Sequence, residues 1–406
     1  MRILFLTQWF QPEPSFKGMP FVKALQNRGH DVEVLTGFPN YPGGKLYPGY
    51  SIRPWKSEVM DGISVNRVAL FPSHDASGFK RIINYLSFGF TSAAFGPFLI
   101  KKPDVIYVYN LVTLGLASSI LRTIYCCPVV YDIQDLWPDS VRHSGMMRQS
   151  TLQNILNIWC KFVYRNASHI TTLSPGMKAE LVKRGIPETN ISVIYNWCDE
   201  RNSCNADKDN IISSNILDED AFVVMYAGAM GIMQGLDTVL DSAQMLMYVE
   251  PRIKFVFVGG GVEQKRLKQS VVDRKLNNVS FIERQPPEKM GLILKAADVL
   301  LVHLKDTALF RITIPSKIQA YMFAGKPVLV GVQGDAAELI SASGAGKAVK
   351  SENPESMTTG ILQLFRMSDA KRGAIGKNAR MYYDENLSME AGVQSFENIF
   401  YRLSQK

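Results

Sequence analysis

The sequence predicts an α/β protein of two Rossmann-like, doubly wound domains that face each other across a cleft. Short apolar runs rich in β-branched residues alternate with helical patterns over nearly all of the 406 residues. Strands that are apolar on both faces and separated by helices are typical of parallel sheets covered on both sides. A chain of this length suffices for two domains of ordinary size.

The strand-like runs fall into two sets, one in each half of the chain. The first set comprises Ile3–Thr7, Val32–Thr36, Val105–Val108, Val129–Tyr131, Ile170–Leu173 and Ile191–Ile194. The second comprises Val223–Ala227, Phe255–Val258, Val279–Ile282, Val299–Val302 and Val328–Val330. Helical segments such as Phe21–Arg28 and Met177–Arg184 lie between the runs. The polar stretch Asp199–Ala221 is the predicted linker, which gives domains at residues 1–200 and 201–387.

Composition and charge restrict the class of partner. The content of 46% apolar and 20% charged residues is typical of a globular protein. Of the net charge of +8, most lies in residues 1–205, which hold 21 Lys and Arg against 14 Asp and Glu. Residues 206–406 hold 24 against 23. A basic first half favours a membrane surface or a lipid diphosphate as partner. No basic run with interleaved aromatic residues occurs, so nucleic acid is not expected.

The cysteines and the N-terminus indicate a cytoplasmic protein. The five cysteines are odd in number and show no CxxC spacing, which predicts reduced thiols and no metal site. The opening residues MRILFLTQWF have the pattern of a strand and are too short and too soon polar for a signal peptide.

The segment Ile82–Ile100 raises the question of a membrane. It carries no charge over 19 residues and is bracketed by pairs of cations at 80–81 and 101–102. Its length alone would permit a membrane span. However, an asparagine, two glycines and a proline are expected to break it, and a predicted strand follows directly. A buried helix and a helix lying in the membrane interface are the favoured alternatives, and a true span is a third, less favoured one.

An anion site is predicted around residues 311–325. Arg311 and Lys317 flank the turn Pro315-Ser316, which opens an apolar-periodic helix that ends at a Gly-Lys-Pro turn. A helix N-terminus with exposed N–H groups and nearby cations suits a phosphate or diphosphate. An ordinary connection between a helix and a strand, with two surface cations, is the alternative.

Other loops fall where a doubly wound domain binds ligands, at the carboxyl ends of strands. The loop Tyr226–Gly235 and the run Gly259-Gly260-Gly261 follow the first two strands of the second domain, and their glycines would let the backbone approach a phosphate. A structural turn would explain these glycines as well. The stretch Asp335–Glu338 could meet sugar hydroxyls or cap a helix.

In the first domain, three carboxylates and a tryptophan follow a predicted strand. Asp132, Asp135 and Asp139, with Trp137 among them, come directly after Val129–Tyr131. Acids this dense at a strand end favour function over packing, and we expect the Asp132 side chain to point into the crevice.

Taken in order, these motifs resemble those of the family-4 retaining glycosyltransferases of the two-Rossmann-domain, or GT-B, type. More narrowly, the chain resembles the WbuB-like bacterial enzymes that assemble O-antigen and capsular polysaccharide. The likeness covers nearly the whole chain and is carried by Arg28-Gly29-His30-Asp31-Val32, Thr36-Gly37-Phe38-Pro39-Asn40-Tyr41-Pro42, the Asp-Leu-Trp-Pro run, Leu173-Ser174-Pro175-Gly176-Met177, Asn196-Trp197, the Gly-x-x-Gln-Gly loop, and Pro315-Ser316-Lys317 through Gly325-Lys326-Pro327.

The resemblance implies transfer of a sugar from a nucleotide-sugar donor with retention of configuration, without a cofactor or a metal. The nucleotide would bind the second domain and the acceptor the first, and a C-terminal helix at 388–406 would pack back on the first domain. The implied partners are a nucleotide sugar, a lipid-linked saccharide and the inner face of the cytoplasmic membrane, bound peripherally. A UDP-linked N-acetylated deoxyhexose is the first choice of donor.

The resemblance also assigns roles to residues. Catalytic contributions are expected from Asp132, Asp135, Arg311 and Lys317. Donor binding is expected from Gly228, Met230, Gly231, Gly259, Gly260, Arg284, Gln285, Pro315, Ser316, Asp335 and Glu338. The acceptor side is expected to include Gly18, Tyr41, Asn110 and Trp137.

The chain departs from the family pattern at positions that matter for the donor. The glutamates of an E-x7-E pair found in many members are replaced by Ile312 and Ala320. The Arg and Lys that often follow the first strand of the second domain are replaced by Ala229 and Gln234. Phosphate-binding charge must then come from the cations at 311 and 317. The histidine that many members present to the acceptor is Asp132 here.

Two alternatives remain open. A non-hydrolysing sugar epimerase shares the two-domain architecture, although matching sets of catalytic His and Glu are missing. A non-catalytic nucleotide-sugar-binding subunit of a polysaccharide assembly complex would account for the missing glutamates. The D-x-D triplets at 207–209 and 218–220 lie in the linker, where solvated charge is expected and a metal is not. His30 ends a helix and precedes a strand, so we expect it to be structural.

Overall fold

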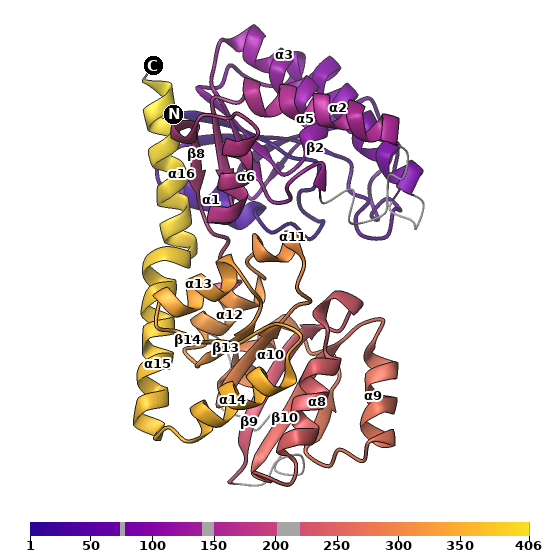
Figure 1. Cartoon of the computed structure of the whole chain (residues 1–406). Coiled ribbons are helices and arrows are strands. Elements are labelled where there is room, and N and C mark those ends of the chain that lie inside the picture. The colour runs from indigo at the N-terminus through magenta and orange to yellow at the C-terminus, as the bar shows by residue number, and fades with distance from the viewer. Residues whose placement is uncertain (74–77, 140–149, 201–219, 406) are drawn as a thin grey trace. The chain divides into compact units, whose positions relative to one another are not determined.

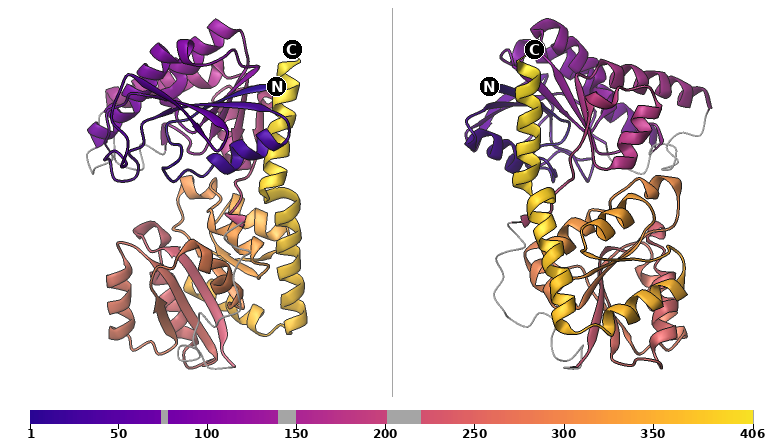
Figure 2. Two further views of the ribbon diagram at one scale, coloured as in Figure 1. Left: turned by 180° about the vertical axis from the view of Figure 1, so that it is seen from behind. Right: turned by 60° about the vertical axis from the view of Figure 1, so that its left-hand side comes forward.

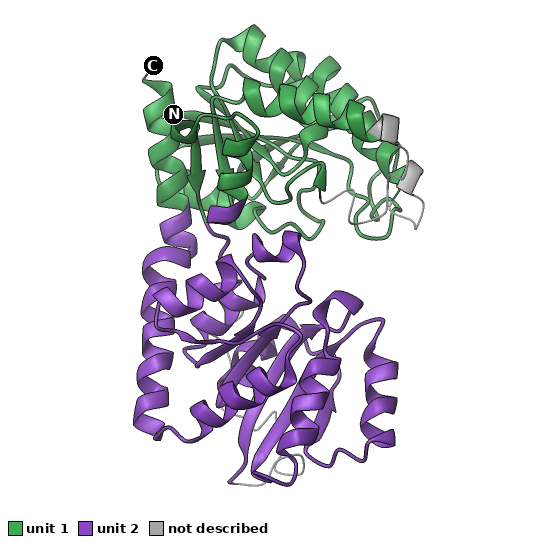
Figure 3. Ribbon diagram, in the orientation of Figure 1, with its two compact units in different colours: residues 1–173, 177–194, 393–406 green, residues 174–176, 195–392 purple. Residues whose placement is uncertain are grey.

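The structure is a computed structural model that describes residues 1–73, 78–139, 150–200 and 220–405. It divides into two compact units, which Figure 3 shows in different colours. Unit 1 comprises Met1–Leu173, Met177–Ile194 and Val393–Lys406, and unit 2 comprises Ser174–Gly176 and Tyr195–Gly392. Most of the predicted linker, including the D-x-D triplet at 207–209, lies outside the described residues.

Unit 1 is built on an eight-stranded sheet in the order β3-β4-β2-β1-β5-β6-β7-β8. Its strands are parallel except β3, which pairs antiparallel with β4. The strands are β1 (Arg2–Leu6), β2 (Asp31–Gly37), β3 (Trp55–Met60), β4 (Ile63–Val68), β5 (Val105–Tyr109), β6 (Val129–Ile133), β7 (His169–Thr172) and β8 (Ile191–Val193). The direction of the chain across the sheet changes between β1 and β5, which is where doubly wound sheets bind ligands.

Helices cover both faces of this sheet. On one face lie α2 (Gly78–Leu99), α3 (Gly115–Tyr125) and α5 (Ser150–Asn166), grouped together in Figures 1 and 2. On the other face, α1 (Met19–Asn27) meets the end of α16 (Met389–Ser404), where the rings of Phe21 and Phe396 are 5.4 Å apart. The remaining elements are η1 (Val112–Leu114), η2 (Glu188–Asn190) and α6 (Pro175–Lys183). The sheet is thus buried on both sides, as its continuous apolar strands predicted.

Two features of unit 1 bear on the prediction. The hairpin β3–β4 was not predicted, because β3 alternates between exposed and half-buried residues at the sheet edge and lacks an apolar run. The glycines and the proline that were expected to break this segment as a membrane span lie inside the continuous helix α2, which either of the favoured alternatives required. Its glycines serve close packing, since a Cβ on Gly89 would lie 2.6 Å from the carbonyl oxygen of Thr113.

Among the described helices, α2 is long and apolar enough to cross a membrane by length and composition, with a mean hydropathy of 1.2 over Lys80–Leu99. One such helix is weak evidence for a span, because core helices meet the same criteria. Here Asn84 and Ser92 are buried, and the Asn84 side chain donates to the Phe71 carbonyl at 2.6 Å. One face of α2 therefore packs on unit 1, while its other face is exposed.

Unit 2 is built on a six-stranded parallel sheet in the order β11-β10-β9-β12-β13-β14. The strands are β9 (Phe222–Ala229), β10 (Ile253–Gly260), β11 (Val279–Ile282), β12 (Val299–His303), β13 (Val328–Gly331) and β14 (Gly346–Ala348). This is the 3-2-1-4-5-6 order of a dinucleotide-binding fold, with its ligand crevice expected beyond β9 and β12.

Alternate residues of β9 fill the cores on the two faces of this sheet: Met225 lies in one core and Val224 in the other. The surrounding helices are η3 (Ile232–Gln234), α8 (Asp237–Leu246), α9 (Gln264–Asp273), α10 (Pro287–Lys295), α11 (Ala308–Arg311), α12 (Lys317–Phe323), α13 (Asp335–Ala342), α14 (Pro354–Phe365), α15 (Asp369–Tyr382) and the π-helical turn η4 (Tyr383–Leu387). The prediction of a helix opening at Pro315-Ser316 and ending before Gly325 is confirmed by α12.

Candidate active site

A glycine-lined recess lies at the carboxyl ends of β9 and β10 in unit 2. Gly228 and Gly259 occupy paired positions with φ angles of 139° and 126°. A Cβ on Gly259 would lie 2.3 Å from the Gly228 carbonyl oxygen, and one on Gly261 would lie 2.3 Å from that of Met230. Glycine is therefore required by both backbone angle and space. The recess encloses about 590 Å³.

The predicted donor-binding residues converge on this recess in part. It is lined by Ala227, Gly228, Ala229, Val258, Gly259, Gly260, Gly261, Arg284, Gln285 and Met290. Arg284 is exposed at its rim and forms no ion pair within the described parts of the chain. Exposed backbone groups and one unpaired guanidinium suit an anionic ligand.

Lys317 brings a second cation against the recess. A Cβ on Gly228 would lie 2.3 Å from Lys317 Cε, so the lysine stem passes directly beneath that glycine. The ammonium contacts the Tyr226 hydroxyl and lies 4.0 Å from the centroid of its ring. Burial lowers the pKa of Lys317 to about 8, because desolvation disfavours the charged form. A bound diphosphate would raise this pKa again and hold the ammonium charged.

Helix α12 is fixed to β9, which sets the position of Lys317. The Tyr321 hydroxyl donates to the Ala227 carbonyl at 3.0 Å and accepts from the Ala227 N–H at 2.8 Å. Ser316 is the N-cap of α12, preceded by Pro315, but its side chain makes no capping hydrogen bond. Tyr226 and Tyr321 were missed in the sequence, where an apolar strand and helix gave no reason to single them out.

Arg311, predicted to share the phosphate charge with Lys317, lies differently. Its guanidinium makes two hydrogen bonds of 2.7 Å with the carboxylate of Asp306, and its side chain is 59% exposed. The guanidinium thus already has a carboxylate partner at the surface. The predicted share of Arg311 in binding the phosphate stays a prediction, and Asp306, five residues earlier, competes for its guanidinium.

Three further residues that were predicted to bind the donor make hydrogen bonds within the protein itself. Met230 is fully buried, and its N–H donates to the Gly260 carbonyl at 2.9 Å. The Gly231 N–H donates to the Gln234 side chain at 2.9 Å, so the glutamine that replaces the family lysine closes the loop. Asp335 accepts the Gly176 N–H at 2.7 Å. Glu338 is exposed on α13.

Asp132, the predicted acceptor-side acid, is buried. It lies inside β6, at 1% exposure. Its carboxylate accepts from Lys17 Nζ and the Tyr107 hydroxyl at 2.6 Å each, and from the Thr171 hydroxyl at 2.9 Å. The prediction that this side chain points into an open crevice is wrong, because β6 continues two residues beyond its predicted end at Tyr131 and Lys17 supplies a buried counter-charge.

Asp135, by contrast, is exposed just beyond the end of β6. Surrounding protein still desolvates its carboxylate enough to raise its pKa above the usual range. Its charge acts on the hydroxyl groups of Tyr85 and Tyr109. Of the two predicted catalytic acids, Asp135 is therefore the one that a substrate can reach.

Unpartnered polar atoms gather around the carboxyl ends of β1 and β5. Asn110 follows β5 with a φ of 76°, and its Oδ1 is buried without a hydrogen-bond partner, as is Oε1 of Gln8 after β1. Buried polar atoms without a partner are unusual in a folded protein, and a polar ligand or a water molecule would satisfy them. Gly18 lies nearby as the N-cap of α1, where a Cβ would be 2.7 Å from the Gln11 amide.

Glu13 is a candidate that no sequence pattern singled out. It is buried and accepts the N–H groups of Asn40 and Tyr41 at 2.6 and 2.7 Å, and that of Phe10 at 3.3 Å. Burial raises its pKa to about 7. Glu13 thereby fixes the loop that carries Tyr41, whose ring lies 5.4 Å from that of Trp9.

Comparison with known sequences assigns both halves of the chain. Residues 19–197 match the glycosyl transferase 4-like domain, and residues 207–382 match the glycosyl transferases group 1 domain. A relative in Escherichia coli, WcaI, which carries the provisional name of a colanic acid biosynthesis glycosyl transferase, is 26% identical over 392 residues and 93% of each chain. The lipopolysaccharide 1,2-N-acetylglucosaminetransferase of Salmonella typhimurium is 25% identical over 57% of this chain and 61% of its own length.

Solved structures share the fold over the full length. Anabaena Alr3699/HepE, in complex with UDP-glucose, matches with a TM-score of 0.70 at 18% identity, over 99% of this chain and 100% of that one. The α,α-trehalose 6-phosphate synthase of Burkholderia multivorans matches with a TM-score of 0.73 at 10% identity, over 100% and 97%. At these identities the likeness shows the fold alone.

Proposed function

The chain belongs to the family-4 glycosyltransferases of the GT-B type, and we propose that it moves a sugar from a UDP-linked donor to a polyprenyl-diphosphate-linked saccharide in the synthesis of a bacterial surface polysaccharide. The sugar transfer would take place at the cytoplasmic face of the membrane. The epimerase and the non-catalytic subunit are set aside, since the chain is a glycosyltransferase.

The observation that carries the donor assignment is the glycine-lined recess with Lys317 against it. Backbone from Gly228 and Gly259 can approach a diphosphate closely, and the ammonium beneath Gly228 supplies a positive charge in a partly desolvated place. The structural neighbour HepE is solved with UDP-glucose, which supports a uridine nucleotide here.

In this proposal, Lys317 stabilises the negative charge that grows on the leaving diphosphate as the glycosidic bond breaks. The acceptor hydroxyl then attacks the same face of the donor sugar that the nucleotide leaves, with retention, and its proton passes to the leaving phosphate oxygen. Asp135 orients the acceptor hydroxyl. No metal is required in this proposal. Within the described residues, no group of three or more metal-liganding side chains occurs.

The acceptor assignment rests on relatives and on unit 1. WcaI and the Salmonella enzyme are named for colanic acid and lipopolysaccharide. Unit 1 carries exposed apolar side chains on α2 and α5, including Phe90 and Ile158, and cations nearby. These properties suit an acceptor that is anchored in a membrane.

Incubation with radiolabelled nucleotide sugars and a polyprenyl-diphosphate-linked saccharide tests the proposal. We expect a labelled lipid product with one UDP-sugar, and N-acetylated deoxyhexoses are the first to try. Failure to transfer from any UDP-, GDP- or dTDP-sugar to lipid-linked acceptors would overturn it. Nuclear magnetic resonance of the product gives the anomeric configuration and so tests retention.

A further inference from the structure

An apolar groove of about 530 Å³ runs along unit 1 between α2, η1, α3 and α5. One stripe of α2 lines it, with Ile82, Tyr85, Leu86, Gly89 and Phe90 at helical spacing. The facing wall is formed by α5, to which Ile155 and Trp159 belong. Leu86 and Phe90 are 55% and 67% exposed, so the groove has an apolar surface that is accessible from outside the protein.

The floor of the groove is built by close packing. A Cβ on Gly115 of α3 would lie 2.2 Å from the Val163 side chain of α5, and a Cβ on Gly89 would lie 2.6 Å from the Thr113 carbonyl oxygen. The indole N–H of Trp159 donates to the Val112 carbonyl at 2.9 Å, which turns the ring face toward its apolar neighbours. The groove is therefore a fixed feature of unit 1.

One end of the groove adjoins the acceptor-side residues. Trp137 lines the groove two residues after Asp135. The charges of Asp135 and Arg81 both act on the hydroxyl of Tyr85, another lining residue. The ring of Tyr85 meets that of Trp9 at 6.0 Å. A molecule in the groove would thus have one end beside Asp135.

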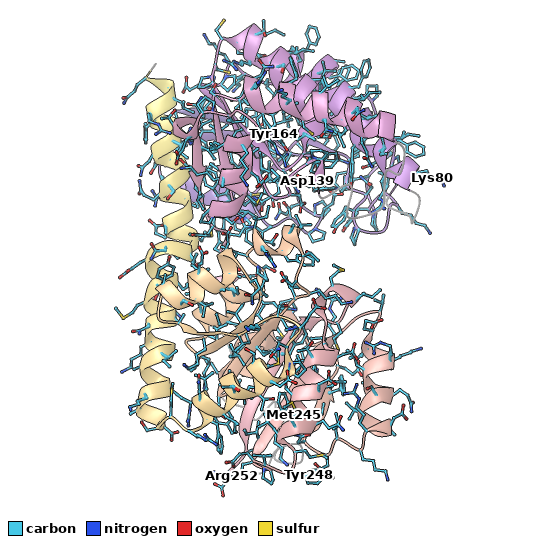
Figure 4. The ribbon with its side chains drawn as sticks, in the orientation of Figure 1. Lys80, Asp139, Tyr164, Met245, Tyr248 and Arg252 are labelled. Atoms are coloured by element: carbon cyan, nitrogen blue, oxygen red, sulfur yellow. The ribbon has the colours of Figure 1, made fainter. Side chains whose placement is uncertain are left out.

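The three long helices that form the groove carry charge of one sign. α2, α3 and α5 contain the cations Lys80, Arg81, Arg122, Lys161 and Arg165 and no Asp or Glu. The Nε of Arg81 is buried without a hydrogen-bond partner at the end of the stripe. Figure 4 shows Lys80 at the start of α2, with its side chain directed away from unit 1. An apolar channel with the Arg81 guanidinium at one end complements a hydrocarbon chain that ends in a phosphate.

We propose that this groove holds the first part of the hydrocarbon chain of the lipid-linked acceptor, with Arg81 facing its phosphate. The inference rests on the proposed function and deepens it, since it assigns the lipid part of the acceptor to a defined binding site. The bound hydrocarbon chain would position the saccharide beside Asp135. The enzyme would therefore prefer acceptors with a long isoprenoid chain to acceptors with a short one.

Two acceptors with the same saccharide diphosphate test this, one with a long prenyl chain and one with a short, water-soluble alkyl chain. We expect the wild type to favour the long chain in kcat/KM. The double variant Leu86→Gln/Phe90→Gln should lower kcat/KM for the long-chain acceptor about tenfold, since each buried methylene contributes about fourfold in binding, and should leave the short-chain acceptor nearly unchanged.

The matched control is Phe98→Gln, which alters an 86% exposed phenylalanine on the same helix outside the groove. An equal loss of kcat/KM for the long-chain acceptor in Phe98→Gln would indicate that the whole exposed face of α2 contacts the membrane. It would overturn the assignment of the lipid to the groove. An unchanged chain-length preference in the double variant, or a change of oligomeric state in place of it, would also overturn it. Transfer to the short-chain acceptor by the wild type tests the proposed function separately.

A second measurement does not depend on turnover. Trp137 and Trp159 line the groove, so binding of a long-chain polyprenyl phosphate carrying a bromine on its first isoprene unit should quench their fluorescence. The quenching should be lost in the double variant and kept in Phe98→Gln. Arg81→Gln should weaken binding of the polyprenyl phosphate but not of the corresponding polyprenol. Quenching that is the same in all variants would contradict the assignment.

Discussion

At the scale of single residues, the structure separates two cations, Lys317 and Arg311, and two aspartates, Asp132 and Asp135, that the sequence analysis treated alike. Lys317 lies against the donor recess, whereas the neighbouring cation Arg311 is paired with Asp306. We expect Lys317→Ala to lower kcat about 10²–10³-fold, because it removes charge stabilisation of the leaving diphosphate. Arg311→Ala should stay close to the wild type. Wild-type turnover in Lys317→Ala would place the phosphate contacts elsewhere.

The pKa of Lys317 gives this prediction a pH dependence. In the enzyme without bound donor, the pKa of Lys317 is lowered to about 8, so its side chain is a charged ammonium below pH 8 and loses this charge above it. The donor needs the charged form, so kcat/KM for the donor should fall as the pH rises through about 8, since kcat/KM reports the free enzyme. Lys317→Arg should abolish this decline, because arginine stays charged.

Substitution of Asp132 should affect the stability of the protein, whereas substitution of Asp135 should affect sugar transfer. Asp132 and Lys17 form an ion pair with both side chains fully buried. Asp132→Asn leaves a buried lysine without its counter-charge and should lower the free energy of unfolding by about 3–5 kcal/mol. Asp135→Asn should leave stability and donor affinity intact and cut transfer at saturating substrates about tenfold. Urea unfolding and donor titration distinguish the two outcomes, and an inactive but fully stable Asp132→Asn would return Asp132 to the site.

At the scale of elements, the loop held by Glu13 should be sensitive to pH. Its pKa is raised from 4.5 to about 7, so the folded protein binds a proton that the unfolded chain has released between these values. The stabilisation is complete below pH 4.5 and is lost as the pH rises through 7, by about 1–3 kcal/mol. Glu13→Gln should flatten the fall in melting temperature between pH 5 and 8. Equal slopes in both proteins would contradict the assignment.

The ends of β9 and β10 should tolerate no side chain. Gly259→Ala would place a methyl group 2.3 Å from the Gly228 carbonyl oxygen, at a φ of 126°. We expect loss of UDP binding in calorimetry, with a destabilised unit 2. Gly373→Ala on α15, where a Cβ meets nothing within 4 Å, is the matched control and should bind UDP normally. Normal affinity in Gly259→Ala would exclude the recess as the nucleotide site.

At the scale of the whole molecule, the uneven charge should govern membrane association. If unit 1 lies on the membrane, binding to anionic vesicles should fall with salt, because exposed charges are screened over about 8–10 Å at 0.10–0.15 M. Lys101→Glu/Lys102→Glu should weaken this binding. The same charge change in unit 2, Lys289→Glu/Lys295→Glu, should not. Binding that is indifferent to both salt and the first pair would favour a purely buried role for α2.

Much of this protein is determined by its sequence through short-range patterns. The runs at 105–108 and 279–282 predicted β5 and β11 within one residue, because continuous apolar runs are a local property of buried parallel strands. The glycines at 228 and 259 were singled out by their place at predicted strand ends, with a structural turn left open as the alternative, and the two strands do meet there in close backbone contact. His30 was predicted to be structural, and it contacts Glu397 of α16 at 2.7 Å.

Only the tertiary structure decided which polar groups are open to a ligand. Asp132 and Asp135 look equivalent in the sequence. In the structure, Asp132 is buried and paired with Lys17, which is 115 residues away in the chain, whereas Asp135 is exposed. The apolar groove is likewise formed by segments near 86, 116 and 155 that no local pattern joins. The physical reason is that burial of a charge, or exposure of a hydrocarbon surface, depends on long-range partners, whereas strands and turns depend on neighbours.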